Sequence, residues 1–266
     1  MIDSHLHLDD AKFAVEVGGT TLAEQVIAQF DQYGIEFVIN NSCDMSTMLA
    51  GIELANKYEK IFATVGMHPH ESKHFNQEFV ARMESCAYNP KVVAVGEIGL
   101  DYYYDLSDRQ IQRDVFACQI EIADKLRLPL TLHVRDAYGD AWDILRAQKK
   151  YLNNGVLWHC YSGSAEFARQ MASQGHYFAF GGAITFKNAN KADVFEQIPF
   201  DRVLSETDSP YMAPVPLRGT VNTPLNIPLI VTKMAEMYGK SVQETEEQVR
   251  ENTLRLFPKI AKYFNK

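Results

Sequence analysis

Residues 1–10 read MIDSHLHLDD, a short apolar segment that ends in two histidines with one residue between them. Successive side chains of an extended strand point to opposite faces, so His5 and His7 share one face and Leu6 takes the other. Two imidazoles at the end of a strand can supply two ligands of a metal site, but an HxH pair alone is a weak signal. The rest of the chain decides whether this segment belongs to a metal-binding fold.

Seven further short apolar runs follow the first, with many β-branched residues among them. Between the runs, apolar residues return every three or four positions, as in Thr21–Tyr33 and Asp108–Leu126, and this period predicts amphipathic helices. Strands that alternate with helices predict parallel βαβ units. The eight predicted strands are Met1–Leu8, Phe37–Asn41, Ile61–Gly66, Val92–Glu97, Leu130–Val134, Val156–His159, Tyr177–Gly181 and Val203–Glu206.

Two architectures satisfy this alternation, a closed barrel and an open doubly wound sheet. The chain has 266 residues, close to the roughly 250 that one barrel of eight units needs. No GxGxxG follows the first strand, as an open dinucleotide-binding sheet would require. Polar residues instead follow several different strands, where barrel enzymes carry their sites. We therefore predict one α/β domain over residues 1–266, a single (β/α)₈ or TIM barrel with its site at the C-terminal mouth.

Composition and charge restrict the setting and the partners. The first residues lack the basic and apolar regions of a signal peptide, and no run of about 18 apolar residues is present. The four cysteines contain no CxxC pair, which favours reduced thiols. We expect a soluble, cytoplasmic protein with no membrane contact. The formal net charge is −8, so any recognition of phosphate must be local rather than the work of a general basic field.

Four more ionisable residues follow other predicted strands, namely Glu97 in VVAVGEIGLD, His133 in LPLTLHVR, His159 in VLWHC and Asp208 in VLSETDSP. Any one of them alone is explained as a hydrogen-bonded polar residue at a strand end. Six ionisable groups that converge on one barrel mouth need a compensating charge, which divalent cations supply. Imidazole and carboxylate ligands without thiolate suit Zn²⁺, Mn²⁺, Fe²⁺ or Mg²⁺, and the four histidines favour the transition metals.

The chain resembles, almost from end to end, the TatD family of metal-dependent deoxyribonucleases in the amidohydrolase superfamily. The proline-rich loop around Arg218, within Ala213–Pro228, is similar to the family's RGxxNxP element, although Thr223 and Leu225–Asn226 replace more usual residues. The other strings that carry the resemblance are DSHLHLD at 3–9, GMHPHE at 66–71, GEIGLDYY at 96–103, LPLTLHVRDA at 128–137, HCYSGS at 159–164 and SETDSPY at 205–211.

The resemblance implies a site with two divalent cations that share one carboxylate. One cation is held by His5, His7, Glu97 and Asp208, and the other by Glu97, His133 and His159. A carboxylate has two oxygens and can span two ions about 3.5–4 Å apart, with the attacking water between them. We assign Asp208 the second role of general base, and Glu97 and Asp208 are therefore the two predicted catalytic residues.

Three residues are candidates for binding the substrate phosphate. The resemblance implies this role for His68 in GMHPHE, although a solvated histidine in a proline-shaped turn is the alternative. Arg135 can pair with a phosphate through two hydrogen bonds, but an ion pair with Asp136 or Asp208 is also open. Arg218 either binds phosphate or is a solvated charge.

Other polar residues near these motifs remain open. Tyr102, Tyr103 and Tyr104 either stack on bases or pack under a loop, and His70 has no assigned role. Asp101 either orients a metal ligand or caps a turn. Cys160 is expected in the core, because it neighbours His159 on a strand whose successive side chains point to opposite faces.

The resemblance implies hydrolysis of DNA phosphodiester bonds, as a 3′–5′ exonuclease that prefers single strands. The expected partner is therefore DNA with single-stranded ends, and no obligate protein partner is evident. A small-molecule amidohydrolase or esterase on the same two-metal barrel is the alternative. A catalytically silent barrel that binds nucleic acid or protein is the third, and the complete ligand set argues against it. Three phosphate candidates, and Glu97 in place of the lysine often used by amidohydrolase relatives, favour the phosphodiester.

Overall fold

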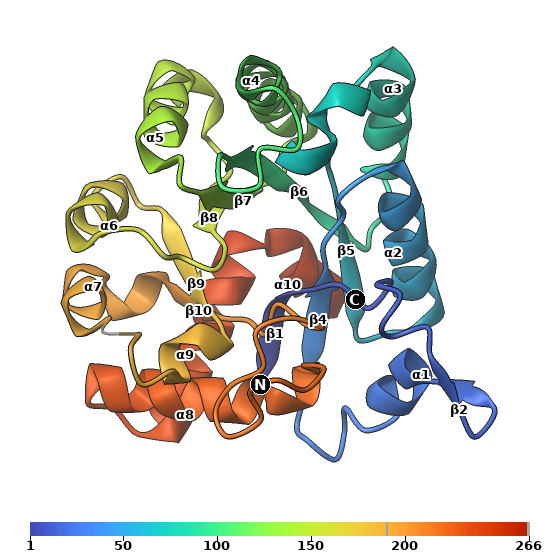
Figure 1. The fold of residues 1–266 in the computed structure, drawn as a ribbon, viewed down its shortest axis with the longest axis vertical. Helices are drawn as coiled ribbons and strands as arrows, with labels where there is room; N and C mark the ends of the chain where they lie inside the picture. The colour runs from blue at the N-terminus through green and yellow to red at the C-terminus, as the bar shows by residue number, and fades with distance from the viewer. Residues whose placement is uncertain (190, 265–266) are drawn as a thin grey trace.

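A computed structural model describes residues 1–189 and 191–264, without the side chain of Val17. Its described part contains an eight-stranded sheet in the order β1-β4-β5-β6-β7-β8-β9-β10, with every neighbouring pair parallel. Figure 1 shows these strands as a ring, viewed approximately along the axis of the barrel. The strands are β1 (Ile2–Leu6), β4 (Phe37–Asn40), β5 (Ile61–Val65), β6 (Val92–Asp101), β7 (Leu130–Arg135), β8 (Val156–Trp158), β9 (Tyr177–Phe180) and β10 (Val203–Ser205).

The first and last strands of the order come together and close the ring. Leu6 forms a parallel bridge with Ser209, and the backbone N–H of His7 donates to the carbonyl of Ser209 over 2.7 Å. Lower in the same seam, the Ser4 hydroxyl donates to the carbonyl of Ser205 over 2.9 Å. The predicted barrel is therefore confirmed, and the open doubly wound sheet is excluded.

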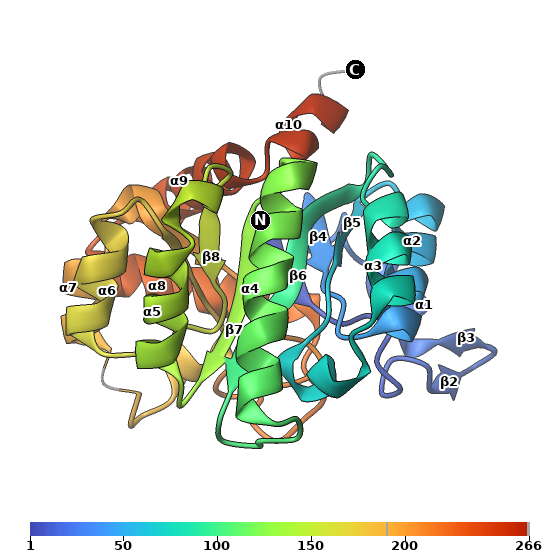
Figure 2. The same ribbon diagram turned by 90° about the horizontal axis from the view of Figure 1, so that it is seen from above.

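Helices surround the strands on the outside of the ring (Figures 1 and 2). No helix of the described chain combines the length and the apolar character needed to cross a membrane. The described helices are α1 (Leu22–Ile27), α2 (Met45–Lys57), α3 (Gln77–Cys86), α4 (Arg109–Leu126), α5 (Tyr138–Ala147), α6 (Ala165–Ala172), α7 (Ala192–Gln197), α8 (Ile227–Tyr238), α9 (Val242–Leu256) and α10 (Pro258–Phe264).

Helix α4 confirms the helix that the amphipathic pattern predicts over Asp108–Leu126. Asp108 accepts hydrogen bonds from the backbone of Gln110 and Ile111 and so caps the first turn. Phe116 and Ile120 are buried on the face toward the barrel. Arg127, with φ of 55°, ends the helix in the left-handed conformation common at C-termini.

The structure differs from the predicted pattern in two places near the N-terminus. The predicted helix Thr21–Tyr33 is a helix only over Leu22–Ile27, because the hydrogen bonds after it change to the tighter three-residue spacing of turns, as from Phe30 to Ile27. A small antiparallel hairpin of β2 (Glu16–Val17) and β3 (Thr20–Thr21), which the sequence pattern did not predict, projects from the side of the barrel (Figure 2).

Apolar side chains fill the inside of the barrel at the N-terminal ends of the strands. Phe37 and Phe62 from the strands pack with Phe257 and Ile260 from the last two helices, and all four are buried. Helix α10 lies across this end (Figure 2). The loops that follow the strands therefore lie at the opposite end, and the proline-rich loop that begins near Ala213 and leads to α8 is one of them.

Candidate metal centre

All six predicted metal ligands meet at the C-terminal mouth of the barrel. They come from five different strands or from the residues just after them. Together with neighbours such as Cys160 and Glu206 they form several overlapping groups whose ligand atoms lie within 4.8 Å of one another. The six residues are His5 in β1, His7 just beyond β1, Glu97 in β6, His133 in β7, His159 just beyond β8 and Asp208 beyond β10.

Glu97 lies at the centre of this cluster and is 2% exposed. Its Oε2 atom is 3.2 Å from Nε2 of His5 and 3.6 Å from Nε2 of His7. Its Oε1 atom is 2.8 Å from Nδ1 of His133 and 3.5 Å from Nε2 of His159. The two oxygens of one carboxylate thus face two separate pairs of imidazoles.

Two glycines allow Glu97 to reach this position. A Cβ atom on Gly96 would lie 2.6 Å from Cβ of Thr131, and one on Gly99 would lie 2.0 Å from the carbonyl oxygen of His133. Side chains at either position would push β6 away from β7. The GEIG string is therefore a requirement of close strand packing, and this packing places Glu97 beside His133.

Asp208 completes the cluster from the seam between β10 and β1. Its backbone N–H donates to the carbonyl of His5 over 2.9 Å, and its Oδ1 atom lies 3.7 Å from Nε2 of His7. Its φ of 55° turns the chain out of the strand direction. Burial, opposed by the nearby imidazoles, raises the pKa of Asp208 to about 6.

The spacing of these donors fits a divalent cation. A tetrahedral ion with bonds of about 2.1 Å separates its ligand atoms by about 3.4 Å. The 3.2 and 3.6 Å distances from Glu97 to His5 and His7, and the 3.5 Å distance to His159, lie around that value. The 2.8 Å distance from Glu97 to His133 is shorter and is that of a direct hydrogen bond. Burial raises the pKa of Glu97, but the imidazoles of His5 and His159 outweigh this effect and hold the pKa well below its usual range. The carboxylate is therefore ready to bind a cation.

A second layer of acceptors holds the remaining nitrogens of the histidines. Nδ1 of His159 lies 2.9 Å from Oε2 of Glu206, whose other oxygen accepts from the backbone of Cys160 over 2.7 Å. Nδ1 of His7 lies 3.0 Å from the carbonyl oxygen of Asn41. Such contacts fix the ring orientation and leave one nitrogen free for a ligand bond. The prediction missed Glu206, although a buried glutamate directly after a strand in SETD was the available signal.

Asp101 holds His133 in the same way. Its Oδ2 atom lies 2.9 Å from Nε2 of His133 and 2.9 Å from Nε2 of His70, and its Oδ1 atom accepts from the backbone of Tyr103 and Tyr104. Asp101 therefore both orients a candidate ligand and caps the turn after β6, so the two predicted alternatives are both realised. His70 lies beside the cluster through this shared carboxylate.

The three phosphate candidates all lie at the mouth. Nε2 of His68 is 3.7 Å from Oε1 of Glu97, and the side chain is buried, so it is not a solvated histidine. Arg135 lies over the ring of Tyr103 at 3.9 Å and, among the described residues, has no carboxylate within 4.0 Å. The ion pair considered as an alternative for Arg135 is therefore absent there. Arg218 lies over the ring of Phe186 at 4.6 Å.

The three tyrosines divide into one anchored and two exposed side chains. The Tyr102 hydroxyl donates to Asp140 over 2.7 Å and accepts from Arg113 over 3.0 Å, so both residues hold this side chain in place. Tyr103 and Tyr104 are 58% and 52% exposed and flank Arg135.

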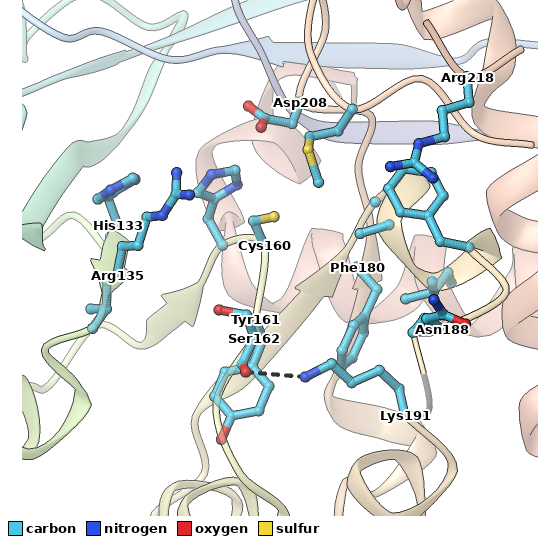
Figure 3. Close-up of a pocket in the computed structure, with 18 of the residues that line it drawn as sticks. His133, Arg135, Cys160, Tyr161, Ser162, Phe180, Asn188, Lys191, Asp208 and Arg218 are labelled. Atoms are coloured by element: carbon cyan, nitrogen blue, oxygen red, sulfur yellow. Dashed lines mark hydrogen bonds between the residues drawn. The ribbon is translucent and has the colours of Figure 1, made fainter. Parts of the chain in front are cut away.

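The prediction for Cys160 was wrong. This residue lies one position after His159 but beyond β8, with φ of 45°, so the alternation of a strand no longer applies to it. Its side chain lines the cavity beside Asp208 instead of the core (Figure 3).

A cavity of about 520 Å³ opens beside the metal ligands His133, His159 and Asp208 (Figure 3). This volume lies within the roughly 300–1,000 Å³ of small-molecule sites. Its apolar lining includes Phe180, Ile184, Phe186 and Met212, and its polar lining includes Arg135, Lys187, Asn188, Lys191 and Arg218.

Comparisons with known proteins agree with this geometry. The family model described as TatD related DNase matches residues 2–258. The chain is 35% identical to the uncharacterized metal-dependent hydrolase YabD of Bacillus subtilis, over 97% of this chain and 98% of that protein. It is 30% identical to the 3′-5′ ssDNA/RNA exonuclease TatD of Cronobacter sakazakii, over 90% and 92% of the two chains.

A similar structure has also been solved. The crystal structure of YJJV, a TatD homologue from Escherichia coli k12, superposes with a TM-score of 0.86 at 26% identity, over 97% of both chains. The family match across nearly the whole chain agrees with the ligand cluster at the barrel mouth. The chain belongs to the TatD family of metal-dependent hydrolases.

Proposed function

We propose that this protein hydrolyses phosphodiester bonds of DNA with two divalent cations, and that it acts from the 3′ end of single strands. The observation that carries the proposal is the position of Glu97, whose two oxygens face two different pairs of histidines. His5, His7 and Asp208 would share one cation with Glu97. His133 and His159 would share the other. The relative named as a 3′-5′ ssDNA/RNA exonuclease supports the choice of substrate and direction.

The reaction needs a positioned water, a base and compensation for negative charge. When bound, the cations would lower the pKa of the attacking water and stabilise charge on the phosphoryl oxygens. Asp208 accepts the proton of that water through its carboxylate, which lies at the boundary between the ligand cluster and the cavity. The water oxygen forms a bond to phosphorus, the bond from phosphorus to the leaving nucleoside oxygen breaks, and that oxygen takes up a proton from solvent.

Groups around the centre bind the substrate or hold the ligands in place. Glu206 and Asp101 keep His159 and His133 in one orientation, so the ligand nitrogens do not have to reorganise during the reaction. His68, Arg135 and Arg218 are proposed to bind phosphate oxygens. The two arginines suit this role because neither is neutralised by a described carboxylate within 4.0 Å.

The test is a substrate panel with protein reconstituted with Mn²⁺ or Zn²⁺. The panel contains one oligonucleotide in linear and in circular single-stranded form, the same sequence as duplex and as RNA, and a dihydroorotate-like ring. We expect stepwise loss of nucleotides from the linear strand and resistance of the circle. Equal rates on both forms would refute the exonuclease assignment, and hydrolysis of the ring alone would favour the amidohydrolase alternative.

We also propose that residues 1–266 act as one domain in the cytoplasm. The four cysteines are free thiols in the described chain, which supports a reducing compartment. Detection of the protein in a cytoplasmic fraction, with the thiols reactive toward an alkylating reagent before any reductant is added, tests the location.

A further inference from the structure

The cavity beside the metal ligands gathers several cationic side chains that form no ion pair with a described carboxylate, although Asp208 lines the same cavity. Four cationic side chains line it: Arg135, Lys187, Lys191 and Arg218. Among the described residues, none of the four has a carboxylate within 4.0 Å. This is notable in a chain with a formal charge of −8, where acidic partners are abundant. Grouped, unpaired cations at a concave site are the usual mark of an anionic ligand.

These cations lie on two sides of the cavity. Figure 3 shows Arg135 beside His133, whereas Lys191 and Arg218 lie across the cavity from it. The Lys191 ammonium donates to the carbonyl oxygen of Ser162 over 3.0 Å, which fixes its position near the cavity wall. One ligand phosphate at the metal ligands would therefore leave the far cations unused.

The surface between the two sides is apolar. Phe180 and Ile184 are buried, and Phe186 and Met212 complete the apolar lining. Arg218 already lies 4.6 Å from the centre of the Phe186 ring, in the arrangement by which a cation and an aromatic ring attract each other. A planar, weakly polar group such as a nucleobase suits this middle section.

We propose that this cavity binds the single nucleotide next to the bond that is cut, and that the positive charge of Lys191 and Arg218, which lie at the two ends of the far wall in Figure 3, attracts the second phosphate of that nucleotide. The inference rests on the proposed phosphodiesterase activity. It adds that the enzyme prefers a chain whose nucleotide in the cavity carries a phosphate on the side away from the cut bond. The 520 Å³ volume accommodates one nucleotide but not a duplex.

The experiment compares three dinucleotides with Mn²⁺-reconstituted protein: thymidylyl-thymidine, its 5′-phosphorylated form and its 3′-phosphorylated form. We expect kcat/KM for one phosphorylated form to exceed that of the parent by about tenfold or more, as a charge-assisted contact provides. The phosphorylated dinucleotide with the higher kcat/KM shows whether the 5′ or the 3′ nucleotide occupies the cavity. Lys191→Met and Arg218→Met should each reduce this ratio to about threefold or less.

The ratio is its own control for folding, because a damaged protein loses activity on all three dinucleotides alike. The matched surface variant Lys150→Met, on an exposed lysine outside the cavity, should keep the full ratio. Equal hydrolysis with and without the terminal phosphate, or a preference that both Lys191→Met and Arg218→Met retain, would overturn this inference and leave the phosphodiesterase intact. Failure to cleave any phosphodiester, long strands included, would overturn both.

Discussion

The two ends of the barrel are built on opposite principles. At the N-terminal end of the strands, Phe37, Phe62 and Phe257 fill the interior, and α10 covers them. At the C-terminal mouth, buried imidazoles and carboxylates face one another around Glu97. Burial of apolar side chains stabilises the fold, whereas burial of ionisable groups costs stability unless a partner compensates the charge.

Backbone conformation shows the same contrast. Among the described residues, six that are not glycine have a positive φ, and only Arg127 of these lies away from the mouth. The other five follow the C-terminal ends of strands, and each left-handed residue costs about 1–2 kcal/mol. They are Asp105, Asp136, Cys160, Asp208 and Met212. Strain is therefore concentrated where the chemistry is, and the apolar end supplies the stability that tolerates it.

The largest expected effect is the loss of activity at the mouth. Asp208→Asn should lower kcat by about 10²–10⁴-fold, because the amide is nearly isosteric but cannot accept the proton of the attacking water. In cation-free protein the unfolding temperature should not fall, because the substitution removes a buried carboxylate whose pKa is raised to about 6. The measurement is steady-state hydrolysis of the linear oligonucleotide beside a thermal melt.

The exposed surface variant Asp143→Asn is the matched control, because among the described residues Asp143 forms an ion pair only with Arg146 on the surface of α5. It should keep wild-type kcat. If Asp208→Asn retained more than about a tenth of wild-type kcat, a loss below about 1.4 kcal/mol, Asp208 would not be the base.

At the opposite end the corresponding change should affect stability and spare the chemistry. Phe62→Ala should lower the free energy of unfolding by about 3–5 kcal/mol, because Phe62 is fully buried among aromatic rings. Its kcat per folded molecule should stay at the wild-type value. Urea unfolding and activity below the transition test both parts, with the 82% exposed Tyr88→Ala as the control. A large fall in kcat would show that the two ends are not independent.

Removal of the cations should lower the free energy of unfolding, because cations bound at the mouth stabilise the folded chain. At a cation concentration of about 100 times Kd, each bound cation should make the protein about 2.7 kcal/mol more stable than chelated protein. Metal analysis should find about two ions per chain, and His133→Ala should retain about one. His74→Ala, at an exposed histidine outside the ligand cluster, should retain both. A wild-type stoichiometry that never exceeds one, across several metals, would contradict the two-cation proposal.

The same contrast explains what the sequence could and could not predict. Strands and ligands were predictable because burial leaves a local pattern, such as the alternation that turns His5 and His7 to one side of β1. Glu206 was missed because its partner His159 is 47 positions away and only the closed barrel brings them together. Cys160 was misplaced because a left-handed residue after β8 ends the alternation.

The cavity was beyond prediction for a related reason. Its far wall depends on how the segment after β9 packs against the loop after β10. A Cβ atom on Gly182 would lie 1.9 Å from the carbonyl oxygen of Met212, so this packing needs a glycine at that point. Contacts between two irregular loops follow no period, and the unpaired cations that they bring together, such as Lys191 and Arg218, look like ordinary surface charges in the sequence.

The smallest expected effect concerns Lys91, the one lysine that the described apolar end buries almost completely. Its ammonium lies 4.6 Å from the Phe62 ring and 4.3 Å from the Tyr263 ring and donates to the carbonyl oxygens of Tyr58, Glu59 and Ile61. Burial lowers the pKa of Lys91 to about 8. No carboxylate within 4.0 Å in the described chain compensates this charge, in contrast to the mouth, where cations are proposed to do so.

The sign of the resulting pH dependence follows from proton counting. Below pH 8 the folded and unfolded chains both carry the proton, and the full cost of burying the charge is present. Between pH 8 and the unfolded pKa of about 10.4 the unfolded chain binds more protons, so this residue makes the protein more stable as pH rises. The gain should be about 1 kcal/mol from pH 8 to pH 9. Burial also lowers the pKa of Lys259 to about 8, so this lysine adds a similar gain in wild type and variant alike. Lys91→Met should remove the gain that Lys91 contributes, and Lys262→Met, on the exposed side of α10, should keep it. Urea unfolding at pH 8 and pH 9 measures the change in the free energy of unfolding. An equal change in wild type and Lys91→Met would mean that Lys91 stays charged and that the apolar end tolerates a buried ammonium without cost.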